Sequence, residues 1–476
     1  MQADVAYSSL FMMSWPRACL LLLLLVWPCS QSATAQTRPP VPPDDRPAEP
    51  VPEPADPMAT ARRPYTSLFG GAVVERQPSN GLRFTGAVFG VYDQNLLAEF
   101  LTPNTPAVSG GYTNLVGDLD YGRRTTRVQV AATGGANARY YTNLNKFAAN
   151  DFHGGAGVSV RLDRLTSLTV NQAVTYAPVF LYGLFASALP PALGSVDSPN
   201  SAFFVNDDRA VTTDSSALFE RRVTERNLIS GSASYRRSHY TVVTSRGTDF
   251  TSVEGGGDYR YRLTQNSDLR LGYFYRKANF IGTEFFGGQV QRPAEHNLHL
   301  GVAYHPSLSE DRRTILTFEG GTSLVNSPVA SNQFQARRQV RVVGDAAIAR
   351  QMGASWLLVA AFRRGTGFVQ GLGGPVFTDA VSLTSTGFFN RRTDLLASVA
   401  YSNGEPTLVG SIATFSTATA NARLRVALTP RWAFVSEYLF YYYDFTKVLT
   451  LAGGLEPQVK RSTVRLGLTM WLPVGR

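Results

Sequence analysis

The chain has only two cysteines, Cys19 and Cys29, and both lie near its amino terminus. Arg17 precedes an apolar run from Ala18 to Val26, and Ala33-Thr34-Ala35 offers the small-x-small cleavage pattern of a secretory signal peptide. Residues 1–35 are therefore predicted to be a signal peptide that is removed with both thiols. The mature chain would then have no disulfide or thiolate chemistry, so a strand ladder would have to hold it together.

Long hydrophobic runs are also missing from the rest of the sequence. The leucine-rich run of the signal is too short, and wrongly flanked, for a retained membrane helix. No later apolar stretch reaches the roughly eighteen residues that a spanning helix needs. With 44% hydrophobic residues and a mean hydropathy of -0.09, only alternating strands would allow this chain to be a membrane protein.

Catalytic and metal-binding patterns are absent as well. The sequence has no GxSxG, HExxH, CxxC or phosphate-binding glycine loop. Ser238 and His239 would point to opposite faces of a strand, and His296 and His299 differ in parity, so neither pair converges as a nucleophile or metal site requires. We therefore expect no enzyme activity and no cofactor. The net charge of +10 suits an acidic lipid surface or an anionic solute better than nucleic acid in a secreted chain.

What the sequence has in abundance is alternation. From Thr126 to Tyr140, apolar and small residues at even positions alternate with Arg127, Gln129, Asn137 and Arg139 at odd ones. This period of two over roughly fifteen residues predicts a long β-strand with one apolar face, whereas strands of soluble proteins average about five or six residues. Strands of about ten or more residues with an apolar outside and a polar inside are typical of membrane barrels.

The alternating unit recurs as a hairpin along the chain. Asp258–Lys277 contains two strands around a polar turn, and Val158–Tyr176 and Ala420–Tyr438 repeat the plan. We predict a single closed antiparallel barrel of about 16–18 strands in up-and-down order over residues 82–476. Strands are expected to begin near Leu82, Tyr112, Thr125, Gly154, Thr166, Asp214, Asn227, Phe250, Asp268, Ala294, Arg313, Phe334, Ser355, Phe377, Thr393, Ile412, Trp432 and Lys460. Short turns follow the even strands and longer connections the odd ones.

Two segments precede the predicted barrel. Residues 36–57 have a proline at nearly every second position from Thr37 onward, which predicts an extended, semi-rigid linker. A docking strip for a periplasmic partner is the alternative to a plain tether. Residues 58–81 are an irregular lead-in.

The signal peptide, the alternating strands and the rhythm of short turns and long loops resemble the outer-membrane β-barrel proteins of Gram-negative-type bacteria. This is the porin-like group that includes exopolysaccharide exporters. The resemblance covers nearly all of residues 82–476 but rests on pattern, and the chain continues past its last apolar alternation through Pro473 to Arg476, where many members end on an aromatic residue. It implies an outer-membrane location with both termini periplasmic. The partners that it implies are membrane lipid and lipopolysaccharide, periplasmic chaperones and the barrel assembly machinery.

A soluble propeller or sandwich is the competing fold. A propeller blade places four short strands in about forty to fifty residues, where this chain places two long ones. Aromatic residues also gather at both ends of the apolar faces, as expected at two membrane interfaces. The outer set is Tyr92, Tyr140, Tyr176, Tyr235, Tyr275 and Tyr401, and the inner set is Tyr121, Tyr261, Tyr304, Trp356 and Trp432.

Arginine dominates the predicted inner face. The pore-lining candidates are Arg127, Arg139, Arg161, Arg236, Arg260, Arg262, Arg270, Arg276, Arg341, Arg363, Arg423 and Arg425, with Arg83 and Arg465 at the same parity. Fewer acids share that face: Asp93, Asp118, Asp120, Glu254, Asp258, Glu319, Asp345 and Glu437. Because arginine attracts carboxylates and phosphates, we hypothesise passive passage of small hydrophilic anions or of an acidic polysaccharide chain. Alternatively, these arginines pair with the acids or with lipopolysaccharide, leaving an unselective pore.

The connection from Pro178 to Thr213 would be the third external loop. By resemblance to porins, Asp197, Asp207 and Asp208 would line a constriction if the loop folds inward, whereas an exposed surface loop is the alternative. A non-conducting structural or anchor barrel associated with envelope or exopolysaccharide assembly is the alternative function. Such a barrel would need loops or a plug, because about eighteen strands enclose more space than wall side chains fill.

Overall fold

The structure is a computed structural model. It describes residues 80–94, 109–141, 146–178, 209–240, 249–281, 292–304, 314–327, 337–353, 355–368, 375–406, 414–445 and 458–475. All of them belong to the compact unit Ala55–Arg476. The predicted signal peptide, the proline-rich linker, nearly all of the lead-in and the acids of the third loop lie outside these residues. Within the described ranges, no helix is long and apolar enough to cross a membrane.

Eighteen strands make up the described part, each of 11 to 18 residues. They are β1 Gly81–Asp93, β2 Gly110–Arg124, β3 Val128–Tyr141, β4 Lys146–Arg161, β5 Thr166–Pro178, β6 Arg209–Arg222, β7 Asn227–Tyr240, β8 Asp249–Thr264, β9 Ser267–Ile281, β10 Ala294–Tyr304, β11 Thr314–Ser327, β12 Arg337–Met352, β13 Trp356–Phe368, β14 Pro375–Asn390, β15 Thr393–Pro406, β16 Phe415–Ala427, β17 Trp432–Asp444 and β18 Gln458–Gly475.

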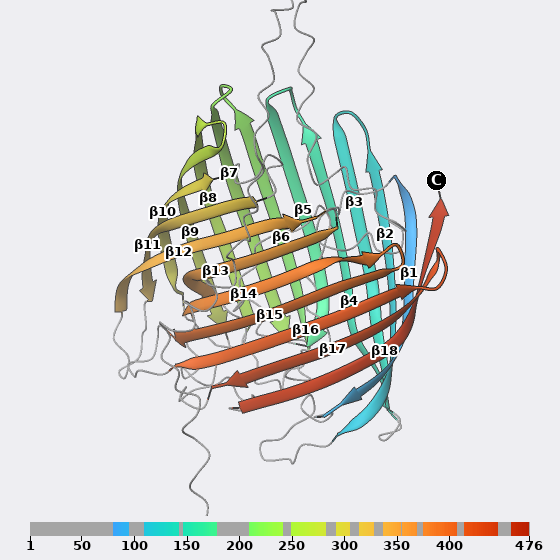
Figure 1. Cartoon of the computed structure of the whole chain (residues 1–476). Helices are drawn as coiled ribbons and strands as arrows, with labels where there is room; N and C mark the ends of the chain where they lie inside the picture. The colour runs from blue at the N-terminus through green and yellow to red at the C-terminus, as the bar shows by residue number, and fades with distance from the viewer. Residues whose placement is uncertain are drawn as a thin grey trace, which may run out of the picture. The chain divides into compact units, whose positions relative to one another are not determined.

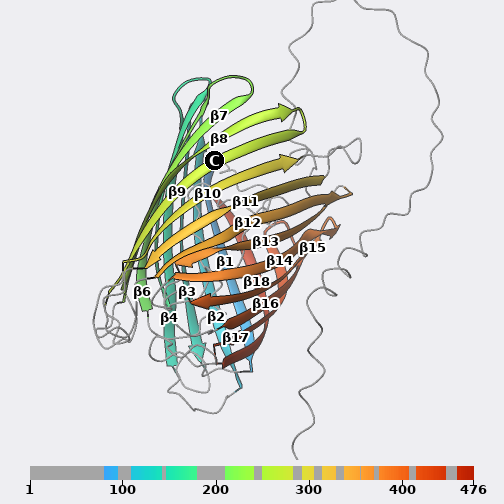
Figure 2. The ribbon, with the colours of Figure 1, turned by 90° about the vertical axis from the view of Figure 1, so that its left-hand side faces the viewer.

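The strands close into a barrel. Each strand pairs antiparallel with the next in the chain, and β18 pairs with β1, for example Leu468 with Val88. Figure 1 shows β1 in blue beside β18 in red, and Figure 2 shows β7 to β15 following one another in chain order along another side. The predicted closed, up-and-down antiparallel barrel is therefore confirmed, at the upper end of the predicted strand number.

One face of the wall is apolar and exposed. The register places Val88, Leu115 and Leu468 side by side on neighbouring strands, where they are 52%, 43% and 44% exposed. Contacts that skip a strand, such as that of His299 on β10 with Asp258 on β8, occur on the opposite face, which is therefore the inside. The apolar face is thus the exterior, and the alternation of the sequence produces it.

The two rims differ in their connections. Turns such as 125–127, 162–165, 223–226 and 391–392 join neighbouring strands at one end, which we call the short-turn rim. β1 begins and β18 ends at this rim, because Leu82 pairs with both Gly475 and Tyr121. The opposite end is the long-loop rim, although β3 and β4 are joined there by only a few residues. β3 begins at Val128, so Arg127 belongs to a turn and not to the predicted strand.

The wall departs from a simple cylinder between β12 and β13. β12 pairs with β11 along nearly its whole length, from Arg337 to Arg350, but with β13 only from Gly344 to Met352. In the described part of the chain, the β12–β13 ladder therefore does not extend to residues 337–343 of β12. We call this gap in the ladder the seam.

Beyond the seam, the long-loop ends of β13, β14 and β15 lie inside the barrel. Thr366 of β13 contacts Ser323 of β11, and Phe368 contacts Phe280 of β9, although neither pair of strands is adjacent in the wall. Residues 375–378 of β14 are all buried, which is incompatible with a wall strand that exposes alternate side chains. We call residues 365–368, 375–380 and 403–405 the tucked strands.

A sequence signal explains this departure. Arg364, Thr366 and Asp379 occupy positions that alternation would place on the apolar exterior. An arginine facing hydrocarbon costs about 2–4 kcal/mol at the middle of a bilayer. Inside the barrel, Arg364 instead lies 3.6 Å from Asp379 and over the ring of Phe377. The outward positions of the tucked strands thus face the inner surface of β8–β12.

Candidate functional site: the charged interior

Ion pairs neutralise many of the predicted pore-lining arginines. Arg425 bonds Asp394 through two nitrogens, at 3.0 and 2.6 Å. Arg139 lies over the ring of Tyr112 and donates to Tyr141. The other pairs are Arg236–Asp214, Arg262–Asp268, Arg276–Glu254, Arg341–Glu405 and Arg363–Asp345, and at the same parity Arg83–Asp120 and Arg465–Glu437. These arginines therefore contribute less to an anion-attracting potential than their number suggests.

Five of the predicted arginines form no ion pair with a described residue: Arg127, Arg161, Arg260, Arg270 and Arg423. Arg260 and Arg270 stand opposite each other in the β8–β9 register, and their Nε atoms are buried without a hydrogen-bond acceptor. The Nε atom of Arg423 on β16 is also buried without a hydrogen-bond acceptor. All three lie in the half of the wall nearer the short-turn rim, where Arg127 and Arg161 are also exposed. The inward arginines that form no ion pair with a described residue therefore gather toward that rim.

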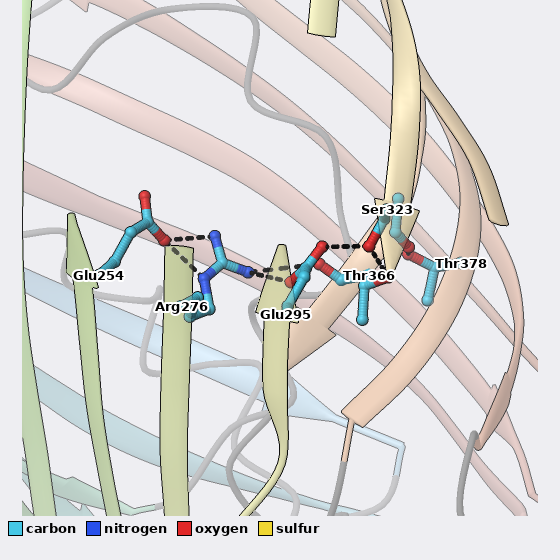
Figure 3. A network of polar contacts seen from close by, with 7 residues as sticks. Glu254, Arg276, Glu295, Ser323, Thr366 and Thr378 are labelled. Atoms are coloured by element: carbon cyan, nitrogen blue, oxygen red, sulfur yellow. Dashed lines mark hydrogen bonds and ion pairs between the residues drawn. The ribbon is translucent and has the colours of Figure 1, made fainter. Parts of the chain in front are cut away.

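Further toward the long-loop rim, the inner face of β8 to β11 carries a bonded network centred on Arg276 of β9 (Figure 3). Its guanidinium contacts Glu254 of β8 at 2.5 Å and Glu295 of β10 at 3.6 Å, and donates to the backbone oxygen of Thr366. Glu295 also accepts a 2.6 Å hydrogen bond from Ser323 of β11. Four wall strands and one tucked strand are thus linked through one arginine, which fixes the tucked strands against the wall.

Two histidines bridge strands by passing over a glycine. His153 of β4 reaches Asp118 of β2 at 3.3 Å across Gly135, and His299 of β10 reaches Asp258 of β8 at 2.8 Å across Gly272. A Cβ at either glycine would overlap both partner side chains, so any larger residue there would displace the histidine from its carboxylate. His299 also lies 2.9 Å from Glu319.

The interior near the long-loop rim is packed. Arg461 and Asp93 form an ion pair whose side chains are 0% exposed, with Thr463 donating to the same carboxylate. Inward aromatic residues at this level, including Tyr441, Tyr443 and Phe415, are equally buried. The described inward side chains near the long-loop rim are therefore densely packed.

A cavity of about 210 Å³ lies between the inner wall and the tucked strands. Glu254, Glu295, Glu319 and Asp345 line it together with Arg276, Arg363, Arg364 and His299. Asn297 also lines it, and its Oδ1 is buried without a partner. Four carboxylates face three arginines and one histidine in this cavity, so its lining is not predominantly positive. In this respect the cavity differs from the group of arginines near the short-turn rim.

The sequence prediction missed several interior acids. Asp214, Glu295 and Asp394 sit at inward positions of β6, β10 and β15, where strict parity counted from the true strand ends identifies them. Glu405 is different, because its inward placement depends on the tucked strands. Arg461, the inward partner of Asp93, is identified by parity in β18.

The remaining candidates do not assemble a reactive site. Ser238 lies 2.8 Å from Thr212, while His239 contacts Asp249 from the other face of β7. His296 is on the exterior beside Tyr273 and Tyr275. Among the described residues, no three metal-binding side chains come together. Asp197, Asp207 and Asp208 lie outside the described residues, so the constriction loop stays a prediction.

No protein-family model and no curated protein matches the chain. Solved structures do match. OpdL of Pseudomonas aeruginosa is 12% identical, covering 83% of this chain and 99% of that chain, with a TM-score of 0.42. The siderophore receptor PirA of Pseudomonas aeruginosa is 9% identical over 86% and 85%, with a TM-score of 0.40. The ferric-catecholate import receptor Fiu of E. coli K12 is 10% identical over 84% and 82%, with a TM-score of 0.42. At these values the likeness carries no functional conclusion for this chain.

Proposed function

We propose that this chain forms an outer-membrane pore for small hydrophilic anions. The pair Arg260–Arg270 carries the proposal. Two guanidinium groups face each other across one register position, and no described carboxylate lies within ion-pair distance of either. Keeping like charges close together is unfavourable unless an anion or water compensates them. In a wet bore they would attract a carboxylate or phosphate.

The outer membrane is the location that the exterior favours. A continuous apolar surface of this kind is disfavoured in water, and strands longer than about ten residues match the thickness of a bilayer. Tyr92, Tyr140, Tyr235, Tyr275 and Tyr401 are exposed toward the long-loop rim, and Tyr121, Tyr304 and Trp432 toward the short-turn rim, as two interfacial belts would be. By the usual asymmetry the short-turn rim is periplasmic, and so are both ends of the barrel.

Planar-bilayer recording of the refolded protein tests the proposal. In a salt gradient, the reversal potential of the native protein is expected to show anion preference. Arg260→Gln combined with Arg270→Gln should shift it toward zero. The matched control is Arg236→Gln, because Arg236 also faces inward but is already paired with Asp214. Cation preference, or equal shifts in both variants, would contradict the role of the unpaired arginines.

The same arginines would attract the carboxylates of an acidic polysaccharide, which has the same chemistry on a larger scale. Liposome swelling with anionic sugars of graded length separates the two substrates. Passage of monomers alone assigns the pore to small solutes, and passage of long oligomers assigns it to the polymer. Lipopolysaccharide, periplasmic chaperones and the barrel assembly machinery are the partners that we propose for a barrel in this membrane.

A non-conducting anchor barrel is the second candidate, and the packed interior at the long-loop rim favours it. Arg461, Asp93 and Tyr443 are as buried as the core of a soluble protein, although they point into the barrel. If the recordings show no conductance at any voltage and the liposomes do not swell, the anchor function replaces the pore.

A further inference from the structure

We propose that the 210 Å³ cavity between the inner wall and the tucked strands binds the ammonium group of a small organic solute. The site is separate from the arginine pair of the proposed pore, and it does not require the barrel to conduct ions.

Two oxygen atoms on β10 lack a hydrogen-bond donor, and both belong to residues that line this cavity. The side chain of Glu295 is only 4% exposed, and its Oε1 atom accepts from Ser323 (Figure 3). Its Oε2 atom lies 3.6 Å from Arg276 and has no hydrogen-bond partner. The Oδ1 atom of Asn297 is also buried without a donor. Since buried acceptors are nearly always satisfied in folded proteins, a ligand that donates to both atoms would be stabilised here.

A single nitrogen atom can reach both oxygens. Glu295 and Asn297 are two positions apart on one strand, which places their side chains on the same face with Cα atoms about 6–7 Å apart. An ammonium group has three N–H donors and bonds acceptors about 2.9 Å away, so it can bridge oxygens up to about 6 Å apart. A hydroxyl group has one donor and would satisfy only one of the two.

The charges around the cavity also favour a cation. In two places one basic side chain serves two carboxylates: Arg276 with Glu254 and Glu295, and His299 with Asp258 and Glu319. Arg363 and Arg364, which also line the cavity, have one carboxylate each. The excess is therefore two negative charges even when His299 is protonated. Partly buried carboxylates without a full share of positive charge are stabilised by an added cation.

The arginine pair of the proposed pore does not cancel this excess at the buried end of the cavity. The described lining does not include Arg270, which lies four residues along β9 from Phe274, the register partner of Asn297. This separation is roughly 13 Å along the strand. Arg270 is closer to Glu319, with which it shares a register row through Gly301. The negative excess beside Asn297 is thus local.

The cavity suits a small solute. Its volume of about 210 Å³ is below the roughly 300 Å³ of ordinary ligand pockets. Glu295 and Thr366 lie at its buried end, whereas the side chains of Asp345 and Arg363 are 63% and 45% exposed. Arg363 is held to Asp345 only by a 3.8 Å contact, so it can also receive a carboxylate. A simple amine and an amino acid therefore share the chemistry that this site recognises.

Equilibrium dialysis of the refolded protein in a non-ionic detergent tests the proposal. The radiolabelled probes have the same four-carbon chain: butylamine, butyltrimethylammonium, butyrate and 4-aminobutyrate. We expect saturable binding of butylamine and no binding of butyrate. Butyltrimethylammonium has the same charge as butylamine but no N–H donor, so it should bind about ten-fold more weakly. Tighter binding of 4-aminobutyrate than of butylamine assigns the site to amino acids, and weaker binding assigns it to simple amines.

Isosteric substitutions in the cavity provide the variants. Glu295→Gln removes one charge but keeps an acceptor for Ser323, and should weaken butylamine binding about ten-fold. Asn297→Asp adds a charge at the second oxygen and should strengthen binding several-fold, a gain that a misfolded barrel would not produce. Glu437→Gln is the matched control. Glu437 is an inward glutamate, 5% exposed and paired with Arg465, and it lies outside the described lining of the cavity.

Three results would overturn the proposal. Absence of saturable butylamine binding means that the cavity holds only water. Equal binding of butylamine and butyltrimethylammonium removes the role of the two acceptor oxygens. Unchanged binding in Glu295→Gln, or an equal loss in Glu437→Gln, places the amine elsewhere. Bilayer recordings depend instead on Arg260 and Arg270, which these variants leave in place, so failure of the pore and failure of this site are distinguishable.

Discussion

Replacement of Arg276 by methionine measures how strongly the tucked strands are held to the wall. Methionine keeps an unbranched apolar stem but removes the guanidinium. Glu295, whose side chain is 4% exposed, would then lose its cation and keep only the hydrogen bond from Ser323. Removing one partner of a buried pair costs about 3–5 kcal/mol, and the 26% exposure of Arg276 reduces our expectation to about 2–4 kcal/mol.

Two further variants isolate the cause. Arg236→Met removes an inward arginine whose pair is 51% and 36% exposed, so its cost should stay below about 1 kcal/mol. The double variant with Arg276→Met and Glu295→Gln also removes the buried negative charge that Arg276→Met leaves without its cation. It should recover about half of the lost stability.

The assay is reversible urea unfolding in lipid vesicles, followed by tryptophan fluorescence. Each free energy of unfolding is extrapolated to zero denaturant with a common slope. If Arg276→Met and Arg236→Met agree within about 0.5 kcal/mol, or if Glu295→Gln brings no recovery, the buried network does not hold the tucked strands.

Three other substitutions test separate features in the same assay. Gly272→Ala should destabilise by about 1–3 kcal/mol, because its Cβ would displace His299 from Asp258, whereas Gly90→Ala, with its nearest atom 3.9 Å away, should be nearly neutral. Leu300→Arg on the exterior should cost about 2–4 kcal/mol in vesicles, and a neutral effect would argue against a membrane-facing wall. Hydrogen bonds from the Leu165 backbone and the Thr166 hydroxyl lower the pKa of Asp163, so its contribution to stability is present at neutral pH and is lost as the pH falls through that lowered value. Unfolding of Asp163→Asn should therefore differ from the native protein at pH 7 and converge with it in acid; a constant difference would contradict this.

The strands of this protein follow from local pattern. Alternation around Val128–Tyr140 and the recurring hairpins predict the number, order and approximate limits of the strands, because side chains in an extended chain point alternately to two faces regardless of what lies beyond them. The apolar exterior and the inward parity of Arg260 and Arg270 follow from the same rule.

The parity of a residue in its strand predicts whether its side chain faces the interior or the exterior of the barrel. It does not predict which side chains of other strands it will contact. The partner of Arg276 depends on the register between β8, β9 and β10, and the partner of Arg341 depends on β15 lying inside the wall. A list of inward arginines therefore overstates the free charge, since the neutralising acids come from other strands.

The sequence by itself determined a long-stranded antiparallel barrel with an apolar exterior and a charged interior. Only the tertiary structure decided that the ladder between β12 and β13 ends at Gly344, that β13 to β15 turn inward, and that the described arginines without an ion pair lie mainly near the short-turn rim. The reason is physical: alternation is a property of each strand alone, whereas the seam arises because Arg364, Thr366 and Asp379 avoid hydrocarbon by packing against strands far away in the chain.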